Sequence, residues 1–338
     1  MKKLIVCVAL TLAFIAAAEP HIRAQLLEKA QDMLGRGPQA VQEKTQAAFS
    51  EQIGSHDTTD MLDVTLYFRF SGTNLLGAQR AQLDIRREET VARSIVQRLI
   101  DGPAVTHGRL NGLFPQGTEI ISVSGEATTA FVTLSRGFLG RPDGAPADWE
   151  DSFAWQEEAA LRRRLAVQSI VLALTEGGRY QRVQMYIADG DDDIPQRIPM
   201  AYFDPYTSDA SLVLAASTRD ESVMLTPGRT MKMILDAWME RDYALMHALL
   251  APGGEDELPT QSAFESKMNE MGISLLDYSA SGGTVSIDGR TATVVVDAQI
   301  RSGEGGDAQI IRESVPLVRT QDNWTIAEEV LLSLMIRD

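Results

Sequence analysis

The sequence predicts an α+β protein with about two folded domains. The chain has 338 residues, and a single domain commonly holds roughly 100–200 residues. Hydrophobic residues make up 44% of the chain and charged residues 23%, which is typical of globular proteins and excludes wholesale disorder. From Met61 onward, strand patterns and helix patterns follow one another in an order that favours helices packed on one face of a small sheet.

The net charge is strongly negative. Asp and Glu together number 47 and Lys and Arg 31, which gives a formal charge of −16 at pH 7. A surface of this kind repels phosphate backbones. We therefore expect no nucleic acid partner.

Residues 1–18 have the pattern of an export signal. Two lysines precede an apolar run at 4–18, and Ala16, Ala17 and Ala18 supply a small-residue cleavage pattern. The run is shorter than the roughly twenty residues that span a bilayer, so we expect cleavage, with an uncleaved, membrane-proximal anchor as the alternative. The single cysteine, Cys7, lies inside this run. The cleaved chain would have no disulfide, thiolate nucleophile or cysteine-ligated metal.

Residues 19–60 lack strand patterning and predict a helical or flexible stalk. Within 21–34, apolar residues recur on one helical face. An amphipathic helix that binds a partner is the alternative interpretation.

Residues 61–206 predict a first domain with the order strand, helix, strand, strand, helix, strand. The first helix has Glu88 and Glu89 in its first turn and ends at Gly102-Pro103. The hairpin is expected to turn at Gly125-Glu126. On the second helix, the spacing of two glutamates and three arginines predicts charge pairs along a solvated face. The expected strands are 64–70, 119–124, 128–134 and 183–187, and the second helix is 152–176, with 165–174 buried.

Four pieces of this domain resemble the GerMN family of spore-germination proteins. They are residues 64–70, the helix end at 99–103, the loop 114–118 with its hairpin, and residues 172–176 followed by the strand 183–187. The resemblance implies a fold similar to the ring-building motif, a compact α+β unit of oligomeric envelope assemblies. The chain has one copy where GerM has two, and it lacks a lipobox. The family-motif positions are Gly102, Pro103, Pro115, Gly117 and Thr175.

A linker at 207–223 separates this domain from a second one at 224–338. The second domain is expected to hold three helices followed by an antiparallel sheet, an order that resembles the NTF2-like α+β cone. The helices are predicted at 230–240, 242–250 and 262–271, and the strands at 274–279, 283–287, 292–300, 309–318 and 324–332.

Residues that could carry catalysis are scattered, so we predict no enzyme and no cofactor. The four histidines lie far apart in the sequence. A hydrolase that uses acids in the NTF2-like pocket is the remaining catalytic alternative, and its candidates are Asp277, Asp297 and Glu313.

One acidic segment could suggest a calcium site. Asp189, Asp191 and Asp193 alternate as in the start of a calcium loop, but the glycine is misplaced and no glutamate follows at the twelfth position. We therefore expect a polar turn, and no metal is predicted.

These features predict an exported envelope protein that acts by protein–protein interaction or scaffolding. The resemblance implies a setting of sporulation, germination or cell-wall maintenance in a Gram-positive bacterium. The expected partners are envelope proteins or further copies of the chain. The alternative function is binding of a small ligand, such as a wall fragment, in the NTF2-like pocket.

Overall fold

The computed structural model describes residues 61–85, 90–189, 194–251, 258–303 and 306–335. These residues belong to one compact unit, Asp60–Asp338. The predicted export signal and stalk lie outside the described residues. Within the described ranges, no helix combines the length and the hydropathy that crossing a bilayer requires.

The first sheet is a long antiparallel hairpin with a short third strand. β1 (Met61–Phe70) pairs with β2 (Leu76–Asp84), and β3 (Leu110–Asn111) pairs with the end of β1. The predicted strand at 64–70 is confirmed within β1. No strand was predicted at β2, whose small and polar residues lack the usual β-branched enrichment. Pairing along β1 supplies what the local propensity lacks.

Helix α4 (Val91–Asp101) follows, and the side chain of Thr90 caps it by accepting a hydrogen bond from the Arg93 N–H. Glu88 and Glu89, which were predicted in its first turn, lie outside the described residues, and the helix that the structure describes begins at Val91. A threonine cap satisfies one of the free N–H groups of the first turn and so defines the start.

The second sheet has the strand order β4-β5-β6-β7, with β8 also paired to β6. β4 and β5 form the predicted hairpin, but the pairing of Glu126 with Thr129 places its turn at Ala127 and Thr128 instead of at Gly125-Glu126. Ala127 accepts the positive φ of 50° that this tight turn requires. The strands are β4 (Ile120–Glu126), β5 (Thr129–Ser135), β6 (Arg182–Ala188), β7 (Gln196–Arg197) and β8 (Ser217–Thr218).

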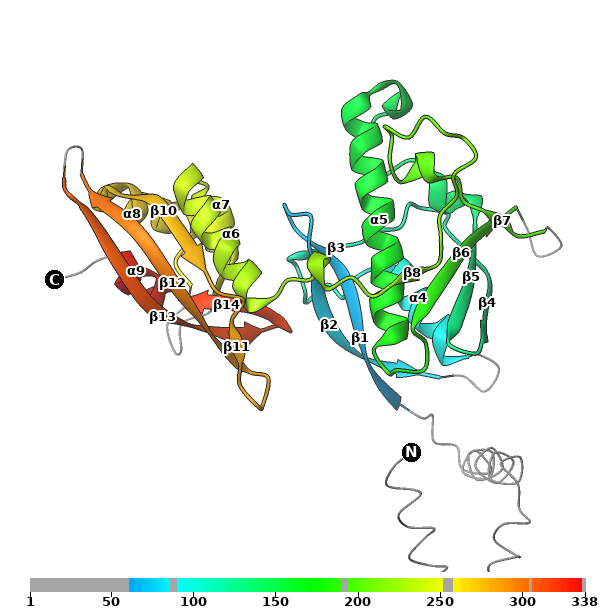
Figure 1. The fold of residues 1–338 in the computed structure, drawn as a ribbon, viewed down its shortest axis with the longest axis horizontal. Helices are drawn as coiled ribbons and strands as arrows, with labels where there is room; N and C mark the ends of the chain where they lie inside the picture. The colour runs from blue at the N-terminus through cyan, green and yellow to red at the C-terminus, as the bar shows by residue number, and fades with distance from the viewer. Residues whose placement is uncertain (1–60, 86–89, 190–193, 252–257, 304–305, 336–338) are drawn as a thin grey trace, which may run out of the picture. The chain divides into compact units, whose positions relative to one another are not determined.

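The long helix α5 (Phe153–Thr175) connects the parallel strands β5 and β6. Figure 1 shows α5 between the two sheets, where it packs against β1 on one side and β6 on the other. Its second half was expected to be apolar nearly all round. The structure confirms this, because almost every residue from Leu165 to Leu174 is buried. Short 3-10 helices precede it at η1 (Arg136–Leu139) and η2 (Trp149–Asp151).

The segment after β7 lies along α5 and leads to the C-terminal half (residues 224–335). It contains η3 (Met200–Tyr202), β8 and η4 (Glu221–Val223). Leu225 N–H then donates to the carbonyl of Leu76 at 2.9 Å. The division of the chain into two domains stays a prediction.

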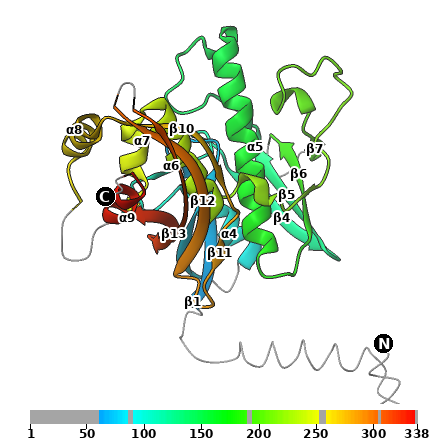
Figure 2. The ribbon, with the colours of Figure 1, turned by 60° about the vertical axis from the view of Figure 1, so that its left-hand side comes forward.

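The C-terminal half has the three expected helices and a curved sheet, which is antiparallel except where residues 250–251, a short strand before the third helix, pair in parallel with its last strand. Figure 2 shows the curvature of β12 and β13. The strand order is β10-β12-β13-β14-β9, with β11 paired to β12. Its elements are α6 (Pro227–Glu240), α7 (Tyr243–Ala248), β9 (Leu250–Ala251), α8 (Gln261–Met271), β10 (Ile273–Ala280), β11 (Thr284–Val285), β12 (Thr291–Ser302), β13 (Ala308–Thr320), β14 (Asn323–Ala327) and α9 (Glu328–Met335).

The last predicted strand, 324–332, is wrong in its second half. β14 ends at Ala327 and α9 begins at Glu328. Two glutamates in the first turn favour the helix, and Leu331, Leu334 and Met335 are buried at helical spacing. The chain is therefore α+β throughout, and the NTF2-like comparison stays a prediction for this half.

Candidate functional site

The loop at 115–118 is held by local hydrogen bonds and close packing. The backbone N–H and the hydroxyl of Thr118 both donate to the carbonyl of Pro115, at 3.2 and 2.7 Å. Gly117 has a φ of 81°. Its carbonyl oxygen packs so closely against Gly137 that a Cβ atom at position 137 would lie only 2.1 Å from it. Two of the family-motif positions, Pro115 and Gly117, therefore form a turn that packs against the backbone after β5.

The other family-motif positions lie at helix ends. Gly102 ends α4 with a φ of 90°, Pro103 follows it, and the next N–H, that of Ala104, donates to the buried side chain of Gln79 at 2.9 Å. Thr175 closes α5 by donating its hydroxyl to the carbonyl of Val171 at 2.7 Å. The five motif positions thus hold turns and helix ends, and they do not converge on one pocket.

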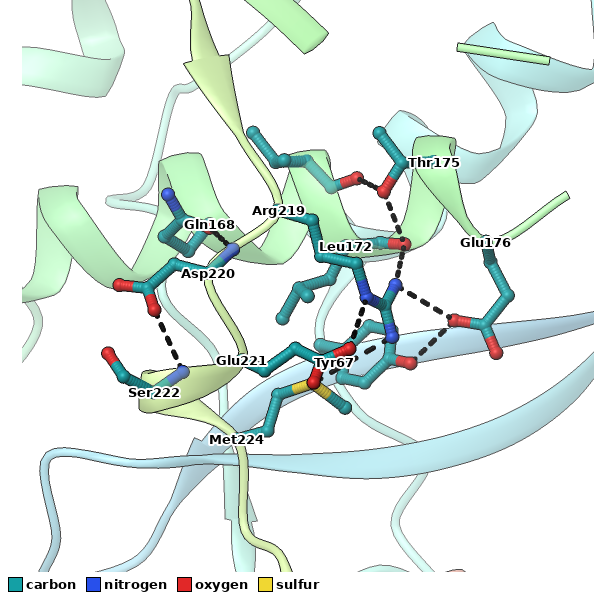
Figure 3. A network of polar contacts seen from close by, with 11 residues as sticks. Tyr67, Gln168, Leu172, Thr175, Glu176, Arg219, Asp220, Glu221, Ser222 and Met224 are labelled. Atoms are coloured by element: carbon teal, nitrogen blue, oxygen red, sulfur yellow. Dashed lines mark hydrogen bonds and ion pairs between the residues drawn. The ribbon is translucent and has the colours of Figure 1, made fainter. Parts of the chain in front are cut away.

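A polar network joins the end of α5 to β1 (Figure 3). The hydroxyl of Tyr67 donates to a carboxylate oxygen of Glu176 at 2.6 Å, and Arg219 approaches the same oxygen at 3.6 Å. Burial, and then the bond to Glu176, raise the pKa of Tyr67 well above its ordinary value of 10.0. Tyr67 is therefore held neutral as a hydrogen-bond donor and is not a nucleophile near neutral pH.

The same network fastens the segment around β8 to α5. Arg219 also reaches the carbonyl of Leu172 at 3.4 Å and the carboxylate of Glu221 at 3.4 Å, while the Asp220 N–H donates to Gln168 at 3.2 Å (Figure 3). These contacts tie residues 219–221 to the helix, and we interpret the network as structural.

The three carboxylates that could have formed a catalytic pocket do not come together. On β12, Asp297 pairs with Arg312, and its neighbour Val296 pairs with Glu313. Because successive residues of a strand point to opposite faces, Asp297 and Glu313 lie on opposite faces of the sheet. Asp277 is opposite Gln299, so it shares the face of Asp297 and is exposed.

The metal candidate is only partly described. Asp189 lies 2.5 Å from the guanidinium of Arg136, while Asp191 and Asp193 lie outside the described residues. In the ranges that the structure describes, no group of three or more His, Cys, Asp or Glu side chains could hold a metal ion. The polar turn stays a prediction.

An exposed aromatic surface surrounds the first turns of α5. We call it the α5 aromatic surface and define it by five large apolar side chains on α5 and on the segment after β7. The rings of Phe153 and Tyr206 meet edge to face with 5.2 Å between centroids, and the two side chains are 48% and 71% exposed. Its members are Phe153, Tyr202, Tyr206, Leu212 and Val213.

A buried arginine, Arg163, packs against Tyr202 of this surface. The guanidinium of Arg163 lies 5.6 Å from the ring of Trp149 and 5.4 Å from that of Tyr202. It donates to the carbonyls of Leu139 at 2.7 Å and Tyr202 at 3.2 Å. Burial lowers the pKa of Arg163 below its usual value. The solvated face predicted for this helix is therefore wrong at Arg163, because aromatic rings and carbonyl groups replace water around the charge.

The α5 aromatic surface was missed by the sequence analysis. Its only local signal is the density of aromatic residues at Trp149, Phe153 and Trp155. Tyr202 and Tyr206 come from another segment, so their position beside α5 depends on the tertiary fold. Carboxylates lie along its edge, and one of them, Glu157, accepts a hydrogen bond from Tyr206 at 2.5 Å.

A second group that the sequence analysis missed lies where residues 104–110 meet the β13–β14 turn. The imidazole of His107 lies 3.7 Å from the carboxylate of Asp322, which also accepts the Arg80 N–H at 2.8 Å. Arg109 reaches the carbonyl of Leu250. More than two hundred residues separate His107 from Asp322, so no local pattern could have predicted their proximity.

Comparison with family models finds one match to part of the chain. Residues 65–193 match the family model Germane, described as "Sporulation and spore germination". In a comparison with curated proteins, none matches the chain.

Three solved structures are similar to the chain at low identity. The tandem GerMN domains of the sporulation protein GerM from Bacillus subtilis are 16% identical, with 47% of this chain and 46% of that chain covered and a TM-score of 0.31. The first GerMN domain alone is 15% identical, with 47% and 96% covered and a TM-score of 0.28. A putative lipoprotein from Clostridium perfringens is 15% identical, with 40% and 80% covered and a TM-score of 0.23.

The chain covers less than half of the tandem GerM structure, and the similarity to the family rests on the family model. That match includes most of β1, together with β2 to β6, α4 and α5, and it contains nearly all of the pieces that carried the resemblance in the sequence. Over residues 65–193 the chain therefore matches the Germane family, whose model is described as "Sporulation and spore germination", and this segment resembles GerMN domains as the sequence predicted.

Proposed function

We propose that this protein is exported to the cell envelope and acts there by binding other proteins, as a scaffold in sporulation, germination or cell-wall maintenance of a Gram-positive bacterium. The observation that carries the proposal is the α5 aromatic surface. It gathers five exposed, large apolar side chains on two neighbouring segments. Exposed patches of this kind are typical of binding surfaces.

The composition of the surface favours a protein as the bound partner. Tyrosine and phenylalanine are enriched in protein interfaces, because they offer a large contact area and lose little conformational entropy on binding. Here the ring of Phe153 already rests on Tyr206, and Tyr202 is stacked on Arg163. Little further ordering is needed when a partner binds.

The charges beside the surface favour a basic partner. Glu157 on α5 and Asp209 after β7 are exposed, as are Glu150 and Asp151 of η2, just before α5. Lysine or arginine side chains flanking an apolar contact would complement them and speed association. An envelope protein with a basic, apolar segment therefore fits this surface better than an acidic second copy of the chain.

The core of the C-terminal half supports docking over ligand binding in the predicted cone. Trp238, Phe264 and Leu331 are buried together with Val294 and Val296 of the sheet in one apolar cluster. Side chains of α6, α8 and α9 thus fill space that a ligand in the cone would need.

Crosslinked pull-down from envelopes tests the proposal. The bait is the full chain, compared with the double variant Phe153→Ser, Tyr206→Ser. The control is the double variant Ile287→Ser, Ile310→Ser, which removes two other exposed apolar side chains, 110% and 79% exposed, from the C-terminal half. We expect the aromatic variant to lose its specific envelope partner and the control to retain it.

The captured partner should also respond to salt. Binding that depends on complementary surface charges weakens as ionic strength rises. Equal capture by the wild type and the aromatic variant would contradict the proposal, as would a partner whose contact segment is acidic.

A further inference from the structure

A cavity of about 290 Å³ lies where residues 106–110 face residues 320–325. The walls come from segments far apart in the sequence, and Leu250 and Leu258 complete them. The volume is near the lower end of the range for small-molecule sites, roughly 300 to 1,000 Å³. The cavity could therefore hold a compact organic molecule larger than a single inorganic ion.

Arg109 places a positive charge in the wall of this cavity, and its guanidinium has few hydrogen-bond partners. Two nitrogens of its guanidinium reach one carbonyl oxygen, that of Leu250, at 3.4 and 3.5 Å. Both contacts are long for hydrogen bonds, and a guanidinium has five N–H donors. In the described part of the chain, Arg109 forms no ion pair with a carboxylate. Burial lowers the pKa of Arg109, as expected for a cation that has lost water without gaining a counter-charge.

His107 adds a second unsatisfied group to the same wall. Its Nε2 atom is buried and has no hydrogen-bond partner among the described residues. The nearest carboxylate oxygen, on Asp322, is 3.7 Å away, beyond hydrogen-bond range. Buried polar atoms in proteins are nearly always satisfied, so this nitrogen indicates a place where a ligand atom belongs.

The remaining lining has apolar, hydroxyl and amide groups, the amides being those of Gln321 and Asn323. Phe70, Leu110, Leu250 and Leu258 form apolar walls, and Thr106 and Thr320 contribute hydroxyls. A ligand that fits has an apolar body as well as a polar end. The charge balance is small, because Asp322 lies beside His107. Asp322 also pairs with Arg80 at 3.5 Å, which leaves Arg109 as the arginine or lysine side chain lining the cavity, and one guanidinium balances a monoanion.

We propose that this cavity binds a small organic monocarboxylate, with its carboxylate on Arg109 and His107 and its apolar body against Leu250 and Leu258. A planar carboxylate matches the fork of a guanidinium and can accept two parallel hydrogen bonds from it. Both halves of the compact unit supply walls, so bound ligand stabilises the contact between them. The proposal does not depend on the α5 aromatic surface, which contributes no residue to the cavity.

Calorimetric titration of the full chain tests this site with benzoate and N-acetylalanine as probes. The controls are benzamide and N-acetylalaninamide, which keep the shape of each probe and remove its charge. We expect each carboxylate to bind at least about tenfold more tightly than its amide, as a charge-assisted hydrogen bond implies. Equal affinities within each pair, or no binding of either carboxylate at millimolar concentration, would overturn the proposal.

Variants identify the residue that holds the carboxylate. Arg109→Gln should remove the preference for the carboxylate over the amide. Arg93→Gln is the matched control, because Arg93 also donates to a backbone carbonyl, that of Ile120, and does not line the cavity. An unchanged preference in Arg109→Gln would refute the proposed contact.

A second variant keeps the test decisive if Arg109→Gln does not fold. Leu258→Trp fills the cavity from its apolar side and leaves Arg109 in place. We expect it to weaken benzoate binding by at least about tenfold while the unfolding midpoint without ligand stays close to that of the wild type. Undiminished benzoate binding by this variant would place the ligand elsewhere.

Discussion

The side-chain amide of Asn323 pairs with the backbone of Ala78 as a neighbouring strand would. Its oxygen accepts the Ala78 N–H at 2.9 Å, and its nitrogen donates to the Ala78 carbonyl at 3.0 Å, across 245 positions of sequence. Asn323 is buried. One side chain thus satisfies a backbone donor and a backbone acceptor of β2 and joins it to the start of β14.

Removing this pairing should destabilise the protein. Asn323→Leu leaves the N–H and the carbonyl of Ala78 without their partner, at a cost of about 1–3 kcal/mol per unsatisfied buried group. Gly77→Ala should act in the same direction, because its Cβ would lie 2.5 Å from the Asn323 side-chain oxygen. Urea unfolding measures both free energies.

The control for Gly77→Ala is Gly112→Ala, whose Cβ would meet no atom within 4 Å. We expect the Gly112 variant to unfold near the wild-type midpoint. If both alanine variants lose the same stability, the close contact between Gly77 and Asn323 does not contribute to the fold.

Tyr67 should make stability fall at high pH. Its pKa is raised above 10.0 in the folded protein, first by burial and then by the bond to Glu176, while in the unfolded chain it titrates near 10. Above that pH the unfolded chain loses the phenol proton and the folded protein keeps it. The contribution of Tyr67 to the free energy of unfolding is therefore complete below pH 10. Above pH 10 this contribution decreases by about 1.4 kcal/mol per pH unit.

Urea unfolding at several pH values checks this dependence in the wild type and in Tyr67→Phe. The variant lacks the titrating phenol, so its stability should decline less steeply above pH 10. Parallel curves for the two proteins would show that Tyr67 does not keep its proton on folding.

Replacing Arg163 should destabilise the protein far more than replacing its neighbour Arg162. Arg163→Met leaves the carbonyls of Leu139 and Tyr202 without their charged donor, and we expect a loss of about 2 kcal/mol. Arg162→Met removes a part-exposed pair with Glu158, for which we expect less than about 1 kcal/mol. Thermal unfolding ranks the two variants, and equal losses would contradict the supporting role of Arg163.

Export can be checked directly on the protein from its native host. We predict a mature chain that begins at Glu19, after the small residues of the cleavage pattern. Mass spectrometry of the N-terminal peptide measures this. A retained Met1 would instead indicate the uncleaved anchor.

Local sequence patterns were sufficient to predict a helix or strand where one of its faces is apolar. The strand within β1, the hairpin of β4 and β5 and the buried half of α5 all follow from periodicity and composition. β2 was missed because its residues carry no strand signal, and α9 was taken for a strand because an apolar run alone does not separate the two structures.

The candidate sites were much less predictable. Within the arginine triplet after Glu158, nothing local distinguishes Arg163 from Arg162, yet Arg163 is buried between two rings. Tyr202 comes from η3, 39 positions further along the chain. The contact that buries Arg163 therefore exists only in the folded protein.

From its residues alone, this protein is predicted to be α+β with a segment that resembles GerMN domains, because the apolar periodicity of each element and the order of its turns are local properties. Only the tertiary structure decided which polar groups meet. Asn323 with Ala78 and His107 with Asp322 are long-range polar pairs, and a single hydrogen bond or charge contact leaves no periodic trace in the sequence that could reveal its partner.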